Sequence, residues 1–274
     1  MEGFFIFVMI ILCALVACYW LDSFESIDKN TNFSPNHKYF PENRVELVCL
    51  LRNESILLNE INTSKVIDMS FLFCNVEGES LNIFQEFGDR ASFNLQNNAG
   101  TRKNFAGIET WDTSNVEDMT GMFAMQTTFN QDISRWNTSK VKSMAGMFFY
   151  ARSFNASIGS WNVSNVLNMT AMFLFAVSFN QDISQWNAEN VRDMGNMFAY
   201  ALAFDKFQGV LQSGLMGKYG SGIKRTGMFS GVKGADVFLR EVIAEYLSVS
   251  RQYQNLTQED IQGLERYVQD LTTI

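Results

Sequence analysis

Histidine and proline are the residues that this sequence most nearly lacks: among 274 residues it has one histidine, His37, and two prolines, Pro35 and Pro41. A serine or cysteine nucleophile needs a base beside it, and histidine is the side chain that most often serves. The chain after residue 41 contains no proline, so no proline-rich linker divides it. The composition therefore gives no support for catalysis that depends on a histidine base.

Basic residues are also scarce. The chain has 21 Lys and Arg against 29 Asp and Glu, which gives a net charge of −8 and a pI of about 4.8. A protein that binds nucleic acid needs a basic surface that displaces counterions from phosphate. We therefore expect no nucleic-acid partner, and we interpret the acidic balance as a solvated surface.

Cysteine is limited to four residues, and two of them lie inside the first apolar run. The remaining pair, Cys49 and Cys74, does not have the spacing of zinc ligands. A Cys49–Cys74 disulfide would fit an extracellular protein, and two buried thiols would fit the sequence equally well.

Motifs for phosphate binding and for nucleophilic catalysis are missing. The glycines between residues 214 and 222 are loosely spaced and form no phosphate loop. Carboxylate pairs such as Glu117 and Asp118 are best explained as surface charges, and nothing indicates the paired carboxylates of a glycoside-acting enzyme. We predict that the chain is not an enzyme, with no catalytic, cofactor-binding or metal-binding residues and no cofactor.

An uncharged run of 19 residues, Gly3 to Leu21, is the first feature that is present. Its length is close to the roughly 20 residues that a helix needs to cross a bilayer. It has three interpretations: a cleaved signal peptide, an uncleaved membrane anchor, or a lipoprotein signal that uses Leu15 to Cys18. In all three the rest of the chain leaves the cytosol, so we expect an extracellular or cell-surface location; a buried core helix is the alternative.

Eight Asn-x-Ser/Thr sequons fit secretion, at Asn32, Asn53, Asn62, Asn137, Asn155, Asn162, Asn168 and Asn255.

The strongest pattern is a repeat of 25 residues in the middle of the chain. Each copy carries a Trp, two Met three residues apart, a Phe directly after the second Met, and another Phe six residues later. Weaker copies precede and follow these four, at Ile61 to Phe73 and Ile223 to Phe229. The aligned positions are Trp111, Trp136, Trp161 and Trp186; Met119, Met144, Met169 and Met194; Met122, Met147, Met172 and Met197; Phe123, Phe148, Phe173 and Phe198; and Phe129, Phe154, Phe179 and Phe204.

Within one copy, the apolar positions have helical spacing from Val141 to Phe154. Ser114 with Glu117 resembles a capping box, and the short piece from Ile133 to Asn137 favours a strand. The prediction is an α/β fold, a leucine-rich-repeat-like solenoid of about five to seven helix-plus-short-strand units with a helical C-terminal cap. The Met, Phe and Trp positions are predicted to form its core.

An asparagine at a fixed position of the repeat predicts a ladder along the stack. Asn130, Asn155 and Asn180 are expected to bond backbone groups inside the turns. The alternative is calcium bound by Asn130 with Asp132 and by Asn180 with Asp182. The intervening copy has Ser157 at the Asp position, which interrupts that pattern.

The predicted domains are a signal peptide or membrane anchor (1–21), a polar stalk (22–43), an N-terminal cap (44–60), the repeat solenoid (61–229) and a helical C-terminal cap (230–274). The two helices expected in the last segment would seal the end of the stack, and a partner-binding helix pair is the alternative.

The pattern W-[ND]-x-S-x-V-x-x-M-x-x-M-F-x-x-A-x-x-F-N-x-x-I, close over residues 111–204 and looser over 61–108 and 205–229, resembles the repeat of BspA-like leucine-rich-repeat surface proteins. The resemblance implies a solenoid at the cell surface that binds a protein or glycan, as in adhesion. A membrane is the further partner expected, through residues 3–21 if they are not cleaved. The alternative is a purely structural surface element without a specific ligand.

Overall fold

The computed structural model describes residues 37–75, 94–215, 224–240 and 266. The apolar run, most of the predicted stalk and most of the predicted C-terminal cap lie outside the described residues. No helix among the described residues is long and apolar enough to cross a membrane.

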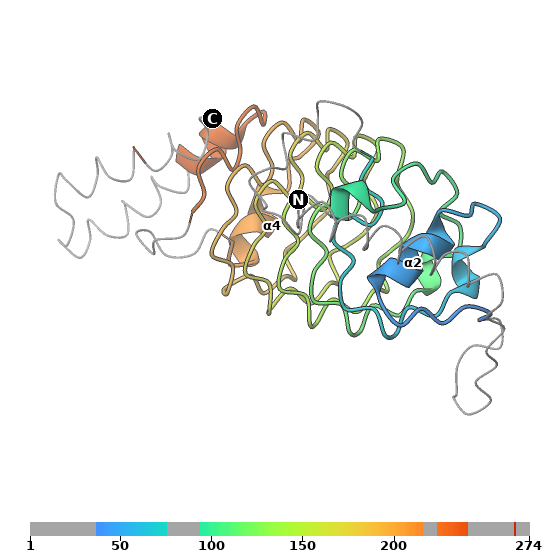
Figure 1. Ribbon diagram of the computed structural model, residues 1–274. Helices are drawn as coiled ribbons and strands as arrows, with labels where there is room; N and C mark the ends of the chain where they lie inside the picture. Colours follow the sequence, from blue (N-terminus) through green and yellow to red (C-terminus); the bar gives the residue numbers. More distant parts are fainter. Residues whose placement is uncertain (1–36, 76–93, 216–223, 241–265, 267–274) are drawn as a thin grey trace, which may run out of the picture.

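The described chain winds into coils that lie side by side along one axis (Figure 1). We name the coils by their ranges: 111–135, 136–160, 161–185 and 186–210, with a first coil formed by 61–75 and 94–110 and a last, partial coil at 224–232. Short helices lie at the edges of the stack. They include α2 (Arg44–Leu51), the 3-10 helices η1 (Leu58–Glu60) and η3 (Ile108–Thr110), and α4 (Phe207–Gln212). Residues 94–96 and 235–240 are also helical.

The predicted α/β fold of helix-plus-strand units is wrong. The described residues contain no β-strand, and the only β-type pairing between neighbouring coils in this part of the chain is a set of isolated parallel bridges such as Asp118↔Ser143 and Ser143↔Asn168. The stretch from Val141 to Phe154, expected to be a helix, is a series of turns. The residues predicted to be core are nevertheless buried: Met144, Met147 and Phe148 are fully covered, and so are their counterparts in the neighbouring coils.

Backbone hydrogen bonding explains why neither element forms. Alternate N–H groups close turns within a coil, as when Met147 donates to the Met144 carbonyl at 3.1 Å. The intervening N–H groups donate to the next coil, as when Phe148 donates to the Met172 carbonyl at 2.9 Å. A helix would keep all of these bonds inside the segment, and a strand would close no turns. The other bonds from this coil to the next are Met144 to Asn168, Gly146 to Thr170 and Tyr150 to Leu174.

Each turn segment from coil 111–135 onward also contains two residues with positive φ, which an α-helix does not tolerate. In coil 136–160 they are Gly146 (φ 59°) and Tyr150 (φ 56°). The first of these positions holds small residues in the repeated coils, whereas the second holds large ones. The equivalents are Gly121, Ala171 and Asn196 for the first position, and Met125, Phe175 and Tyr200 for the second.

Ring stacking continues from coil to coil through the core. Phe148 stacks on Phe154 within its own coil at 3.7 Å between ring centroids, and on Phe173 of the next coil at 5.7 Å. Deep burial of each such ring contributes about 1.5–3 kcal/mol, so the columns hold the stack together. Each indole N–H is also satisfied, because Trp136 donates to the Ile108 carbonyl at 3.1 Å and Trp161 to the Ile133 carbonyl at 3.0 Å.

The first coil accommodates an insertion without interrupting the stack. Residues 61–75 bond directly to 111–125, as when Met69 donates to the Asp118 carbonyl at 2.9 Å. The coil is completed further along the chain, where Phe105 contacts Phe129 edge-on at 5.1 Å. The segment between 75 and 94 is therefore additional to the repeat rather than part of it.

Two glycines with the same backbone conformation provide a matched test of this packing. We expect Gly146→Ala to cost about 1–2 kcal/mol of unfolding free energy, the strain of a Cβ at positive φ, because its nearest neighbour is 3.8 Å away. Gly121→Ala should cost about 1–3 kcal/mol more, because its Cβ would lie 2.4 Å from the Phe71 ring. Urea unfolding followed by tryptophan fluorescence measures both; equal losses would contradict the packing described.

Candidate functional site

The asparagine ladder exists, but it lies at the surface rather than inside the turns. The side-chain oxygen of Asn130 accepts the N–H of Asn155 at 2.7 Å, and that of Asn155 accepts the N–H of Asn180 at 2.8 Å. The neighbouring Asp132 accepts the N–H of Ser134 at 3.0 Å, so it closes a local turn. No group of His, Cys, Asp or Glu among the described residues is arranged to hold a metal ion.

The capping box proposed at Ser114 has no helix to cap. Its N–H instead donates to Asp112 at 2.9 Å, and the equivalent Asn137 accepts from Ser139 at 3.1 Å. This position of the repeat therefore serves a turn. Cys74, one of the two cysteines outside the first apolar run, is buried in the first coil.

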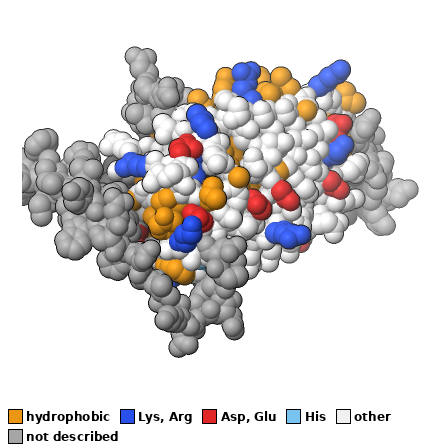
Figure 2. Space-filling view, turned by 90° about the vertical axis from the view of Figure 1, so that its right-hand side faces the viewer, with side chains coloured by type: hydrophobic (Ala, Val, Ile, Leu, Met, Phe, Trp, Pro, Cys, Tyr) orange, Lys and Arg blue, Asp and Glu red, His pale blue; other side chains and the backbone are white. Residues whose placement is uncertain are grey.

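The exposed repeat positions beside the bridges form one column, which we call the bridge face: Ile67, Glu117, Lys142, Leu167 and Arg192. Consecutive members are bonded through the backbone, and Glu117 pairs with Lys142 at 2.6 Å. The hydrogen bond and the charge of Lys142 lower the pKa of the Glu117 carboxyl. Charges of both signs therefore neutralise each other here. The end of the stack shown in Figure 2 likewise carries scattered charges of both signs.

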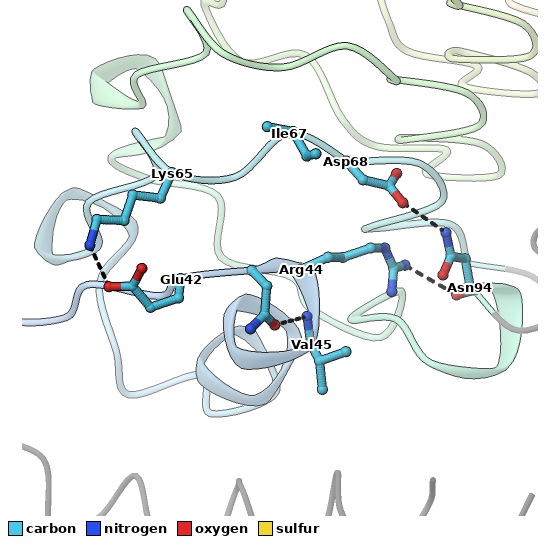
Figure 3. Close-up of a pocket in the computed structure, with 8 residues that line it drawn as sticks. Glu42, Arg44, Val45, Lys65, Ile67, Asp68 and Asn94 are labelled. Carbon is cyan, nitrogen blue, oxygen red and sulfur yellow. Dashed lines mark hydrogen bonds and ion pairs between the residues drawn. The ribbon is translucent and has the colours of Figure 1, made fainter. Parts of the chain in front are cut away.

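A pocket of about 460 Å³ lies at the N-terminal end of the bridge face, between α2 and the first coil (Figure 3). Val45 and Ile67 form its exposed apolar walls, with 37% and 60% of their surfaces accessible. Lys65 and Glu42 form an ion pair across one rim. At the other rim, the Asn94 amide donates to Asp68 at 3.5 Å.

The most prominent cation in the pocket wall has a structural role. Arg44 is buried, and its guanidinium donates to the carbonyls of Ser70 (3.0 Å), Asn97 (2.8 Å) and Asn94 (3.3 Å). In the inner coils, the equivalent carbonyl accepts a backbone N–H from the preceding coil, as when Ala145 accepts the N–H of Gly121. Arg44 therefore caps the open edge of the stack, and its donors are directed away from a ligand.

Arg102 is a second buried arginine at this end, with 2% of its surface accessible. Its guanidinium donates to the carbonyls of Leu51 and Ile56, at 2.9 and 2.6 Å. Burial lowers the pKa of this guanidinium and the charge of Glu54 raises it. The side chain thus ties α2 and the segment after it to the first coil.

An aromatic column at the second positive-φ position is the feature most suited to binding. Met125, Tyr150, Phe175 and Tyr200 occupy this position in successive coils, and each is partly exposed. Tyr150 contacts Phe175 edge-on at 5.9 Å between centroids, and Phe175 stacks on Tyr200 at 4.7 Å. Phe149, which is almost completely buried, supports the column from beneath.

The surroundings of this column contain almost no charge. The segments 124–128, 149–153, 174–178 and 199–203 include a single charged residue, Arg152, and no carboxylate. The Arg152 guanidinium lies over the Tyr150 ring at 5.2 Å, and Leu202 extends the apolar surface with 58% of its area accessible. We call the column with these two flanking residues the aromatic face.

Backbone strain gives this face a second distinction. A large side chain in the left-handed region costs roughly 1–2 kcal/mol, which glycine avoids and asparagine reduces. The regular coils use glycine, alanine or asparagine at the first positive-φ position, and the first coil has Phe71 there. At the second position the chain keeps Tyr150, Phe175 and Tyr200. Strained residues of this kind cluster where side chains have a function. The repeat analysis missed these residues, although their spacing of 25 residues in the sequence was a usable signal.

A family model described as "Mycoplasma protein of unknown function, DUF285" matches residues 91–209, which span the regular coils. No curated protein and no solved structure matches the chain. Over the matched range the chain is thus similar to proteins whose function that description leaves open.

Two arginines of the N-terminal end test the role of Arg102. We expect Arg102→Met to cost about 3 kcal/mol of unfolding free energy, because it leaves several buried carbonyls without a donor. Arg52→Met serves as the control, since Arg52 is exposed and donates to one carbonyl, that of Asn98, at 3.1 Å. Its expected cost is below about 1 kcal/mol. Similar losses from both substitutions, measured by urea unfolding, would contradict a clamp at Arg102.

Proposed function

We propose that this chain is an exported or membrane-tethered cell-surface repeat protein that binds another protein through its aromatic face. The composition of that face carries the proposal. The centres of protein–protein interfaces are enriched in aromatic residues, Met and Arg and are depleted of Asp, Glu and Lys. The aromatic face has this composition, in a chain whose net charge is −8.

The orientation of the rings favours a protein over a glycan as the ligand. Sugars stack on accessible ring faces, but here the face of Phe175 is covered by Tyr200 and that of Tyr150 by Arg152. These contacts cover one face of each of the two rings, which leaves less ring face for a sugar. Ring edges and a Met side chain pack well against the apolar side chains of a polypeptide.

The location is part of the same proposal and is supported by the sequence. The uncharged run Gly3 to Leu21 indicates export or anchoring, and the repeat motif resembles that of BspA-like surface proteins. Sequencing the N-terminus of the mature protein and digesting intact cells with an external protease test this part. A surface location would be contradicted if the mature protein still began with the apolar residues 3–21 and the rest of the chain were not cut by the external protease.

The binding part is tested by removing the rings without changing the backbone preference. In the variant Tyr150→Asn/Phe175→Asn/Tyr200→Asn, asparagine retains the left-handed conformation, as Asn196 already does in this chain (φ 55°). We expect a partner that the full chain enriches from extracellular protein to be lost by this variant, because the apolar anchors are gone.

The matched control is Ile67→Asn/Leu167→Asn, which removes two exposed apolar side chains from the bridge face. This control should keep the partner, and urea unfolding of both variants verifies that they fold. A partner that binds the ring-free variant as well as the original chain would overturn the proposal, as would loss of binding in the control alone. A failure to enrich any protein would favour the purely structural alternative.

A further inference from the structure

The aromatic face also constrains the shape of its partner, and this inference rests on the proposed function. We propose that the partner is an amphipathic α-helix lying along the aromatic column. It would place one apolar side chain per turn against successive rings, and a carboxylate beside Arg152.

The spacing of the rings supports a helix. Successive ring centroids lie 5.9 Å apart between Tyr150 and Phe175 and 4.7 Å apart between Phe175 and Tyr200. The pitch of an α-helix is about 5.4 Å, which falls between these two distances. Side chains on one face of an extended strand repeat at about 6.6 Å, which is longer than both. A helix parallel to the column therefore keeps its apolar side chains in step with the rings over several coils.

The relief of the face fits the same partner. Three successive coils contribute a ring to one continuous row, and Met125 ends the row with a flexible thioether side chain. Apolar side chains at positions i, i+3 or i+4 and i+7 of a helix also form one row, which can pack along such a column. Leu202 widens the apolar surface beside Tyr200, where the next side chain of the helix would lie.

The charge of the face argues against a second copy of this chain and for a partner that carries a carboxylate. Arg152 is exposed, and the four segments that form the face contain no acidic residue. Two copies meeting through this face would leave Arg152 without a counterion, because these four segments contain no carboxylate. A carboxylate on the flank of a bound helix would instead pair with the guanidinium over the Tyr150 ring.

The test uses a synthetic peptide of about 18 residues, or about five turns, with leucine once per turn and one glutamate beside the leucine stripe. Its binding to the full chain is followed by fluorescence anisotropy. The control peptide has the same composition with leucines at alternating positions, the pattern of a strand. We expect the helical peptide to bind at least tenfold more tightly than the control peptide, and Phe175→Asn to weaken its binding at least tenfold.

A charge exchange identifies the contact with Arg152. Arg152→Glu should weaken binding of the glutamate peptide several-fold, and a peptide with lysine in place of that glutamate should restore it. Leu167→Asn, on the bridge face of the same coil as Phe175, should leave the affinity unchanged. Arg152 is exposed, so its substitution keeps the test valid even where Phe175→Asn prevents folding.

The results separate this inference from the proposed function. Equal binding of both peptides, binding of neither, or equal losses from Phe175→Asn and Leu167→Asn would overturn the helical partner. Failure of the lysine peptide to restore binding to Arg152→Glu would remove the carboxylate from the proposal. Protein binding by the aromatic face is judged by the pull-down with the ring-free variant, which does not require the partner to be a helix.

Discussion

The division of backbone N–H groups between two directions is the constraint on which the rest of the structure depends. Within a turn segment, alternate N–H groups bond inside the coil, and the intervening ones reach carbonyls of the next coil, as Phe148 reaches Met172. A single coil therefore leaves half of these donors without an acceptor and cannot bury its own rings. Each coil requires its neighbours, and the open edge at the N-terminal end requires the guanidinium of Arg44.

The same constraint creates the aromatic face. Alternating bond directions are accompanied by positive φ at two positions in each segment from coil 111–135 onward, and the side chain at the second position is partly exposed in coils 111–135 to 186–210. The strain at Tyr150, Phe175 and Tyr200 is offset by stacking between coils and by the support of Phe149. A repeat that is needed for folding thereby spaces a row of surface rings regularly, which is the property that the proposed binding function uses.

The two faces of the stack contrast in chemistry although the same repeat generates them. The bridge face varies between apolar, acidic and basic residues, and its charges neutralise each other, as Glu117 and Lys142 do. The aromatic face keeps a large side chain at one position through four coils, Met125 in the first of them and a ring in the other three. The pocket beside α2 joins the bridge face, but Arg44 in its wall caps the stack, and Glu42 and Asp68 at its rims are paired with Lys65 and Asn94. This difference is the reason that binding is proposed at the rings and not at the pocket.

The sequence by itself determined the 25-residue period and the residues that fill the interior, because a column of identical coils repeats its buried positions at a fixed interval. It did not determine the local conformation, since the spacing of Val141, Met144, Met147 and Phe148 is shared by a helix and by overlapping turns. Only the tertiary structure decided between them, because half of the hydrogen bonds that favour the turns lead to another coil. The tertiary structure also determined the aromatic face. The sequence contains its residues at regular spacing, but their partial exposure and their left-handed backbone follow from the stacking of the coils.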